Sequence, residues 1–169
     1  MTERTGHVVQ INISQGGVPK LPVPRARVGF TGLEGDGHSD KRNHGGPDRA
    51  VSLLAIEVID QLRAEGHPIA PGSTGENLTV SGLEYTDLQR GDRLQIGNEV
   101  LLELTTNATP CTTIADSFQD GDYSRLSHKR HPGSARWYAR VLRAGFIETG
   151  AEIRLLQSEG IPQGGAASV

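Results

Sequence analysis

The sequence predicts a mainly β protein with a few short helices, arranged as a compact mixed β-barrel. Most of the chain consists of short β-prone runs bounded by glycines or charged turns, and few stretches have helical apolar spacing. The length of 169 residues fits a single domain, which we expect to span residues 1–157. Residues 158–169 are small, polar and glycine-rich, which predicts a flexible C-terminal tail.

Two strands are expected near the N-terminus. His7–Ile13 alternates polar and apolar residues, is rich in β-branched side chains, and ends at the turn Gly16-Gly17. Val23–Val28 predicts a second strand. Pro22 and Pro24 place its start at a sheet edge or a bulge, because proline cannot donate a hydrogen bond to a ladder.

A strand that leads into a helix is expected next. Val51–Leu54 is a compact apolar run, and apolar residues then recur at helical spacing over Ile56–Glu65, before Gly66. Asn77–Val80 predicts a further strand. The sequence therefore places one helix among the strands.

The second half of the chain is predicted to contain a β-hairpin, a short helix and two more strands. The hairpin pairs Arg93–Ile96 with Val100–Thr106 through the tight turn Gly97-Asn98. The apolar spacing over Thr112–Phe118 favours a short helix. The final strands are expected to be Arg136–Leu142 and Glu152–Leu156, joined by a turn over Gly145–Gly150.

The composition excludes several classes of protein. A single cysteine cannot form an internal disulfide, so a secreted disulfide scaffold is excluded. No stretch approaches the roughly 20 apolar residues that a membrane helix needs, and the opening MTERTGHVVQ lacks the apolar core of a secretory signal. We therefore expect a cytoplasmic protein that does not contact a membrane.

The charges are nearly balanced but unevenly placed. The chain has 17 basic and 20 acidic residues, yet the segment 125–143 holds several Arg and Lys and no Asp or Glu. Such a segment attracts anions. A pI near 6.1 and the few aromatic residues argue against nucleic acid as the partner. A small phosphorylated ligand fits the balance of charge better.

The lone cysteine, Cys111, is the first candidate for chemistry. It follows Pro110 and lies at or just before the first turn of the short helix, where backbone N–H groups favour a thiolate. A thiolate is both a nucleophile and a soft metal ligand. The alternative is an inert, buried cysteine that packs as a small apolar residue.

The polar, glycine-rich stretch GLEGDGHSDKRNHGGPDRA, residues 32–50, is the second candidate. One interpretation is a zinc or iron site built from Asp36, His38, Asp40 and His44, and with it a zinc-dependent hydrolase that uses His38, Asp40 and His44. Another is an anion-binding loop in which Arg49, with Arg42 or His44, holds a phosphate. A solvated charged loop is the third interpretation.

The segment STGEN, residues 73–77, is the third candidate because it leads directly into an apolar strand. Glu76 could serve as a general acid or base, or accept a hydrogen bond from a heterocycle, with Asn77 orienting it. A plain β-turn at the start of a strand is the alternative.

Taken together, six motifs in order resemble the MOSC family, named for the C-terminal domain of molybdenum cofactor sulfurase. The motifs are GGVPKLPV (16–23), GLEGDGHSDKRNHGGPDRAVSL (32–53), GENLTVSGL (75–83), GDRLQIG (91–97), TPC (109–111) and ARWYARVLRAGFIETGAEIRLL (135–156). The resemblance covers nearly the whole chain and implies a β-barrel like the small barrel domain of pyruvate kinase. Asn107 stands where many small relatives carry a basic residue.

The resemblance also implies a cofactor and the residues that hold it. The family cysteine, matched by Cys111, would bind the molybdenum of the molybdenum cofactor (molybdopterin) or carry sulfur. Lys20 and Arg49 would contact the phosphate and the pterin, and Asn77 with Glu76 the polar edge of the pterin. His44 and Thr109 complete the expected cofactor-binding set, and pyridoxal phosphate binding is implied only as a family-level term.

Two functions follow from the resemblance. The first is an oxidoreductase that reduces N-hydroxylated or other small N-oxygenated compounds, as in the mitochondrial amidoxime-reducing component. The chain has no cysteine-rich iron–sulfur pattern, so separate electron-transfer proteins would supply the electrons. The second is a non-catalytic carrier of the cofactor or of persulfide sulfur on Cys111. The sequence leaves the oligomeric state open.

Overall fold

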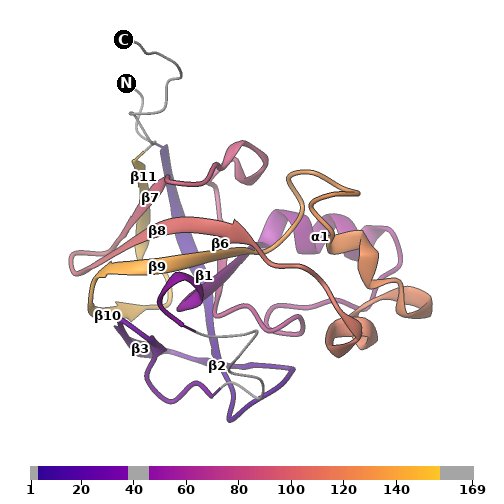
Figure 1. Cartoon of the computed structure of the whole chain (residues 1–169), viewed down its shortest axis with the longest axis horizontal. Helices are drawn as coiled ribbons and strands as arrows, with labels where there is room; N and C mark the ends of the chain where they lie inside the picture. Colours follow the sequence, from indigo (N-terminus) through magenta and orange to yellow (C-terminus); the bar gives the residue numbers. More distant parts are fainter. Residues whose placement is uncertain (1–3, 38–45, 157–169) are drawn as a thin grey trace.

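A closed β-barrel forms the centre of the computed structural model, which describes residues 4–37 and 46–156 (Figure 1). Going round the barrel, seven strands follow one another and the last pairs with the first. In that order they are β11 (Glu152–Leu156), β7 (Arg93–Ile96), β8 (Val100–Asn107), β9 (Trp137–Arg143), β5 (Val51–Ala55), β6 (Leu78–Ser81) and β1 (Arg4–Ile13). The predicted mainly β barrel is confirmed.

The strand β5 is completely buried. All five of its residues are buried, as its unbroken apolar run predicts. It pairs in parallel with β6 and antiparallel with β9. The helix α1 (Ile56–Ala64) begins where β5 ends and packs Val58, Ile59 and Leu62 against β5 and β6. The predicted strand-to-helix unit is therefore confirmed.

The long strand β1 closes the barrel. Its first half pairs antiparallel with β11, and the segment His7–Ile11 pairs with β6, with a register shift between Val8 and Gln10. Near Gly6, β1 pairs with β11 on one side and with β6 on the other. A Cβ at this position would overlap the carbonyl oxygen of Ser81, so only glycine lets the three strands approach as they do.

The predicted strand Val23–Val28 is wrong as a single element. The chain instead forms β2 (Leu21–Val23), which pairs with β1, and β3 (Arg25–Gly29), which pairs with β10 (Gly145–Glu148). Pro24 separates them. Because proline has no N–H to donate, the ladder stops there and the chain crosses from the barrel to a small second sheet.

The turn predicted over Gly145–Gly150 is also wrong, because it contains the strand β10. Only Ile147 of that strand is buried, so its alternation is short and weak in the sequence. The strands β9 and β11 are not neighbours either, since β7 and β8 lie between them. The second sheet is completed by β4 (Gly32–Leu33).

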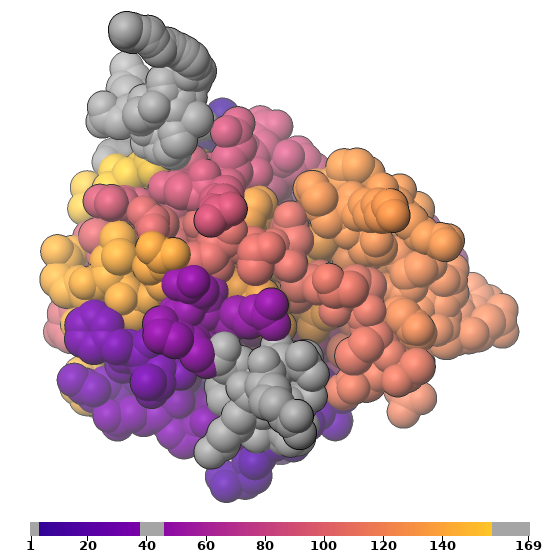
Figure 2. Space-filling view, in the orientation of Figure 1, coloured from indigo at the N-terminus to yellow at the C-terminus, as the bar shows by residue number. Residues whose placement is uncertain are grey.

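Short 3-10 helices cover one end of the barrel. The helix predicted over Thr112–Phe118 is the 3-10 helix η3 (Thr112–Ser117), and η4 (Gln119–Gly121) and η5 (Tyr123–Leu126) follow it. Figure 2 shows this part of the chain, in salmon and orange, as a lobe beside the barrel. Two single turns, η1 (Pro47–Arg49) and η2 (Tyr85–Asp87), complete the described elements.

The hairpin between β7 and β8 is confirmed, although its loop has three residues, 97–99, because Ile96 pairs with Val100. Within residues 4–37 and 46–156, no helix has the length and apolar character needed to cross a membrane. The expected tail, residues 158–169, lies outside the described residues.

Candidate functional site

A cavity of about 530 Å³ opens where β8 ends and β9 begins. Its wall comes from several separate parts of the chain: the loop before β2, the turn η1, the start of β5, the segment before β6 and the connection from β8 to η3. A volume of this size suits a small-molecule or cofactor site. The barrel thus brings together the segments that the sequence motifs single out.

Five of the seven residues predicted to form the site line this cavity. They are Lys20, Arg49, Asn77, Thr109 and Cys111. Their positions span most of the chain, so only the closed barrel places them on one wall. Their proximity is a property of the fold, whereas their role in holding a cofactor stays a prediction.

Cys111 lies at the rim of the cavity and is partly exposed. Its backbone is extended, with φ −146° and ψ 179°, and it immediately precedes η3. Because η3 is a six-residue 3-10 helix and not an α-helix, the helix-dipole argument for a thiolate is weaker than the sequence suggests. The inert, fully buried cysteine is not what the structure shows.

Lys20 is already paired with a carboxylate. Its Nζ lies 2.7 Å from Oδ2 of Asp36, and the two side chains are 9% and 2% exposed. Asp36 also accepts hydrogen bonds from Nδ2 of Asn77 at 2.9 Å and from the backbone N of Ser14 at 3.0 Å. This network fixes Lys20 and Asn77 in the wall and largely neutralises the charge of the lysine.

Glu76 does not line the cavity. It is fully buried, and its carboxylate accepts hydrogen bonds from the backbone N of Gly72 and from the hydroxyls of Thr74 and Thr79. Burial raises the pKa of this carboxyl above its usual 4.5, although the three hydrogen bonds act in the opposite direction. The geometry assigns Glu76 to bracing the turn at residues 72–76, not to general acid or base catalysis on a ligand.

Glu76→Gln tests this assignment through the pH dependence of stability. Because the folded-state pKa is raised, the wild type is most stabilised below pH 4.5 and loses stability as the pH rises through the folded-state value. Gln keeps the shape and does not ionise. The free energy of unfolding of the variant minus that of the wild type is expected to increase with pH and then level off, measured by urea titration across the acid-to-neutral range. A difference independent of pH would contradict the burial argument.

Of the charged residues that line the described part of the cavity, Arg136 is the one that sequence reasoning did not assign to the site. It lines the cavity just before β9, is 9% exposed, and donates from Nη1 to the carbonyl oxygen of Thr74 at 2.7 Å. The available signal was the segment 125–143, which has basic residues and no acidic ones. The composition of this segment does not distinguish Arg136 from its other basic residues, because Arg136 differs from them in how deeply it is buried.

An aromatic ring and an amide add to the cavity wall. Tyr138 lies beneath the guanidinium of Arg49, whose Cζ is 5.4 Å from the ring centroid. Asn107 donates from Nδ2 to the carbonyl oxygen of Arg136 at 3.3 Å. The wall therefore presents an aromatic face and hydrogen-bonding groups beside the cations.

Most of the predicted metal loop lies outside the described residues. His38, Asp40 and His44 lie outside the described residues, as does Arg42, while Asp36 is engaged with Lys20. In the part of the chain that the structure describes, no group of three or more His, Cys, Asp or Glu side chains is placed to hold a metal ion.

The chain belongs to the MOSC domain family, whose model matches residues 40–154. The chain is 32% identical over 142 residues to the uncharacterised protein YflK of Bacillus subtilis. It is 33% identical over 132 residues to a protein of Gibberella moniliformis named "Reductase". These alignments cover 83% and 75% of this chain, but only 63% and 23% of the two relatives.

A solved structure supports the fold. The crystal structure of the YuaD protein from Bacillus subtilis superposes with a TM-score of 0.74, covering 91% of this chain and 97% of that one, at 21% sequence identity. At this identity the likeness concerns the fold. The expectation of a MOSC-type barrel is thereby confirmed.

Proposed function

We propose that this protein binds the molybdenum cofactor and reduces N-hydroxylated or other small N-oxygenated compounds, with electrons from separate proteins. The observation that carries the proposal is the convergence of the Cys111 thiol and three basic side chains on one cavity of a MOSC barrel. A fungal relative named "Reductase" supports the reaction type.

The residues present fit such a cofactor. A thiol at the rim is the soft ligand that molybdenum accepts, and Arg49 offers a planar fork for a phosphate. Asn77 and Thr109 supply polar groups for the edge of a heterocycle. The cavity therefore contains the donor types that a metal-bearing, phosphorylated pterin requires.

When bound, the cofactor would supply the redox chemistry, and the chain would bind and orient it. Cys111 would hold the metal end at the open rim, where a small substrate can enter. Arg49, backed by the ring of Tyr138, would hold the anionic end. Lys20, fixed by Asp36, would orient the polar wall and contribute little net charge.

Cys111→Ser tests the proposal. Both proteins are made in a host that produces the cofactor, and the wild type is expected to retain molybdenum. The molybdenum content per chain of the variant should be lower by about tenfold or more, because a hydroxyl is a poor substitute for a soft thiolate ligand. Elemental analysis of the purified proteins measures this. Thr112→Ala, at the exposed neighbouring residue, is the matched control and should retain molybdenum as the wild type does. Equal molybdenum in wild type and Cys111→Ser would show that the ligand assignment is wrong.

A carrier role is the second candidate, and the partial exposure of Cys111 favours it. An accessible thiolate can attack the outer sulfur of a donor persulfide, which forms a persulfide on Cys111 and releases the donor as a thiol. Transfer of that sulfur to an acceptor thiol regenerates the thiol of Cys111. Mass spectrometry of freshly isolated protein would then show a sulfur adduct on Cys111. A reproducibly bare thiol during sulfur delivery would count against this role.

A further inference from the structure

The guanidinium of Arg136 is buried and forms no ion pair within the described part of the chain. Its side chain is nine-tenths buried, and no carboxylate of the described residues lies within ion-pair distance of it. One of its N–H groups donates to the carbonyl oxygen of Thr74, and its Nε has no hydrogen-bond partner. A buried guanidinium with an unused donor is costly unless something else supplies the missing charge.

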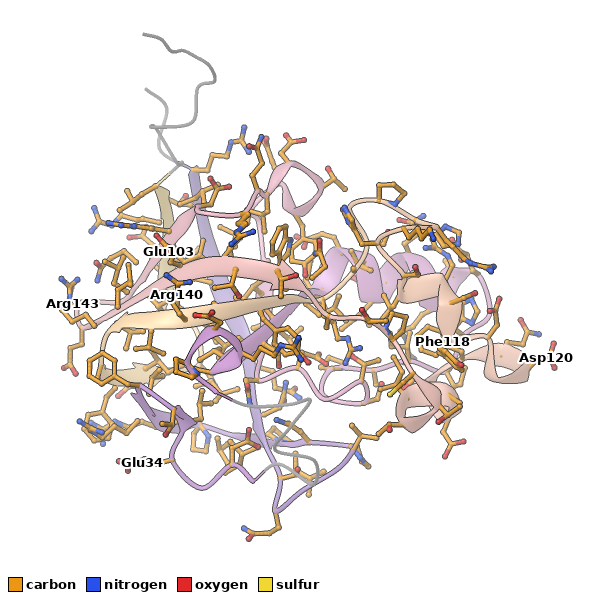
Figure 3. The ribbon with its side chains drawn as sticks, viewed as in Figure 1. Glu34, Glu103, Phe118, Asp120, Arg140 and Arg143 are labelled. Atoms are coloured by element: carbon orange, nitrogen blue, oxygen red, sulfur yellow. The ribbon has the colours of Figure 1, made fainter. Side chains whose placement is uncertain are left out.

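Other basic residues of the same region are compensated by carboxylates. Arg125 pairs with Glu65 at 2.9 Å, and Arg140 pairs with Asp48 at 3.0 Å and with Glu103 at 3.3 Å. Figure 3 shows Arg140 beside Glu103 on the neighbouring strands β9 and β8. Arg136 differs from them in being buried against the cavity and in having no carboxylate partner among the described residues.

The cavity wall supplies no negative charge for Arg136. Among the described residues that line the cavity, the charged side chains are Lys20, Arg49 and Arg136, and none is Asp or Glu. Asp36, which does not line the cavity, neutralises the charge of Lys20. No described residue of the cavity wall therefore compensates the charge of Arg136, and an anionic ligand in the cavity would do so.

We infer that Arg136 anchors an oxyanion subsite in this cavity, which takes a phosphate or carboxylate group of the ligand. A guanidinium presents its N–H groups in a plane that matches two oxygens of such a group. Because Lys20 is neutralised, the anion contact expected of it passes to Arg136. The subsite follows from the charges of this chain and holds whether or not molybdenum binds.

Phosphate binding to full-length protein made in a host that lacks the cofactor tests the subsite. Inorganic phosphate is expected to bind the wild type saturably and to shift the NMR signal of the Arg136 Nε–H group. Arg136→Met should weaken binding about tenfold to a hundredfold, the scale of a charged hydrogen bond. Arg136→Lys should fall between the two, because it keeps the charge and loses the fork.

Arg143→Met is the matched control, since it removes an arginine from β9, the strand that directly follows Arg136. In Figure 3, Arg143 lies far from Phe118, the residue between η3 and η4. Its Nη2 donates to Oε1 of Gln95. This variant should bind phosphate as the wild type does. If Arg136→Met does not fold, the wild-type Nε–H shift and Arg136→Lys still decide the question. The inference is overturned if the wild type shows no saturable binding, or if Arg136→Met binds as tightly as the wild type.

Phosphate binding to cofactor-loaded protein identifies the source of the anion. If the cofactor contributes the phosphate, the loaded protein no longer binds inorganic phosphate. If an anionic substrate contributes the group, the loaded protein still binds it. Phosphate binding without molybdenum retention contradicts only the proposed function. Molybdenum retention with phosphate binding insensitive to Arg136 contradicts only the subsite.

Discussion

Asp36→Ala is expected to lower the free energy of unfolding by about 3–5 kcal/mol, the usual cost of removing one partner from a buried ion pair. The substitution leaves the Lys20 ammonium buried without its counter-charge. It also removes the acceptor for Nδ2 of Asn77 and for the backbone N of Ser14. Urea unfolding followed by the fluorescence of Trp137, the only tryptophan, measures the loss.

The double variant Asp36→Ala with Lys20→Met separates the charge from the hydrogen bonds. Because it removes both charges, we expect it to regain part of the stability that Asp36→Ala loses. If the double variant is no more stable than Asp36→Ala, the unpaired ammonium is not the main cost. The lost contacts to Ser14 and Asn77 would then account for the effect.

Gly6→Ala should be the most damaging single-methyl change in the barrel, with a loss of about 3 kcal/mol or more. The added Cβ would overlap the Ser81 carbonyl oxygen, which belongs to a neighbouring strand and cannot rotate away as a side chain can. β1 would have to move away from β6, which weakens the hydrogen-bonded ladder between these two strands. Thermal unfolding followed by circular dichroism reports the change.

Gly29→Ala provides the matched comparison, because it adds the same methyl group to another strand residue. Its Cβ would meet atoms no closer than 3.7 Å, an ordinary contact distance. We expect its melting temperature to stay close to that of the wild type. If the two variants melt alike, close packing at Gly6 is not what holds β1 against β6.

The sequence predicts the strands of the barrel wall well because their signals are local. β5 reads as an unbroken apolar run, and the hairpin of β7 and β8 has alternation on both sides of a glycine turn. β10 has one buried residue, Ile147, and depends on pairing with β3, from which it is distant in the chain. No local pattern could show that partner, so the segment resembled a turn.

The site could be predicted in part, because some of its residues lie in recognisable local motifs. Ordered motifs identified Lys20, Arg49, Asn77, Thr109 and Cys111, and the fold places them on one cavity. The roles of Glu76 and Arg136 were not predicted correctly, because they depend on how deeply each side chain is buried. Glu76 carries a carboxylate of catalytic type but lies sealed in the protein, whereas Arg136 resembles its exposed neighbours in sequence and is buried.

The seam between β1 and β11 also constrains how the chain folds. Arg4 pairs with Leu155, so nearly the whole described chain must be made before this contact can form. During synthesis the barrel stays open at this edge, with β1 paired to β6 but lacking its other neighbour. Such long-range closure slows folding and leaves a strand edge exposed to other chains until β11 emerges from the ribosome. The last strand is therefore the step at which folding competes with aggregation.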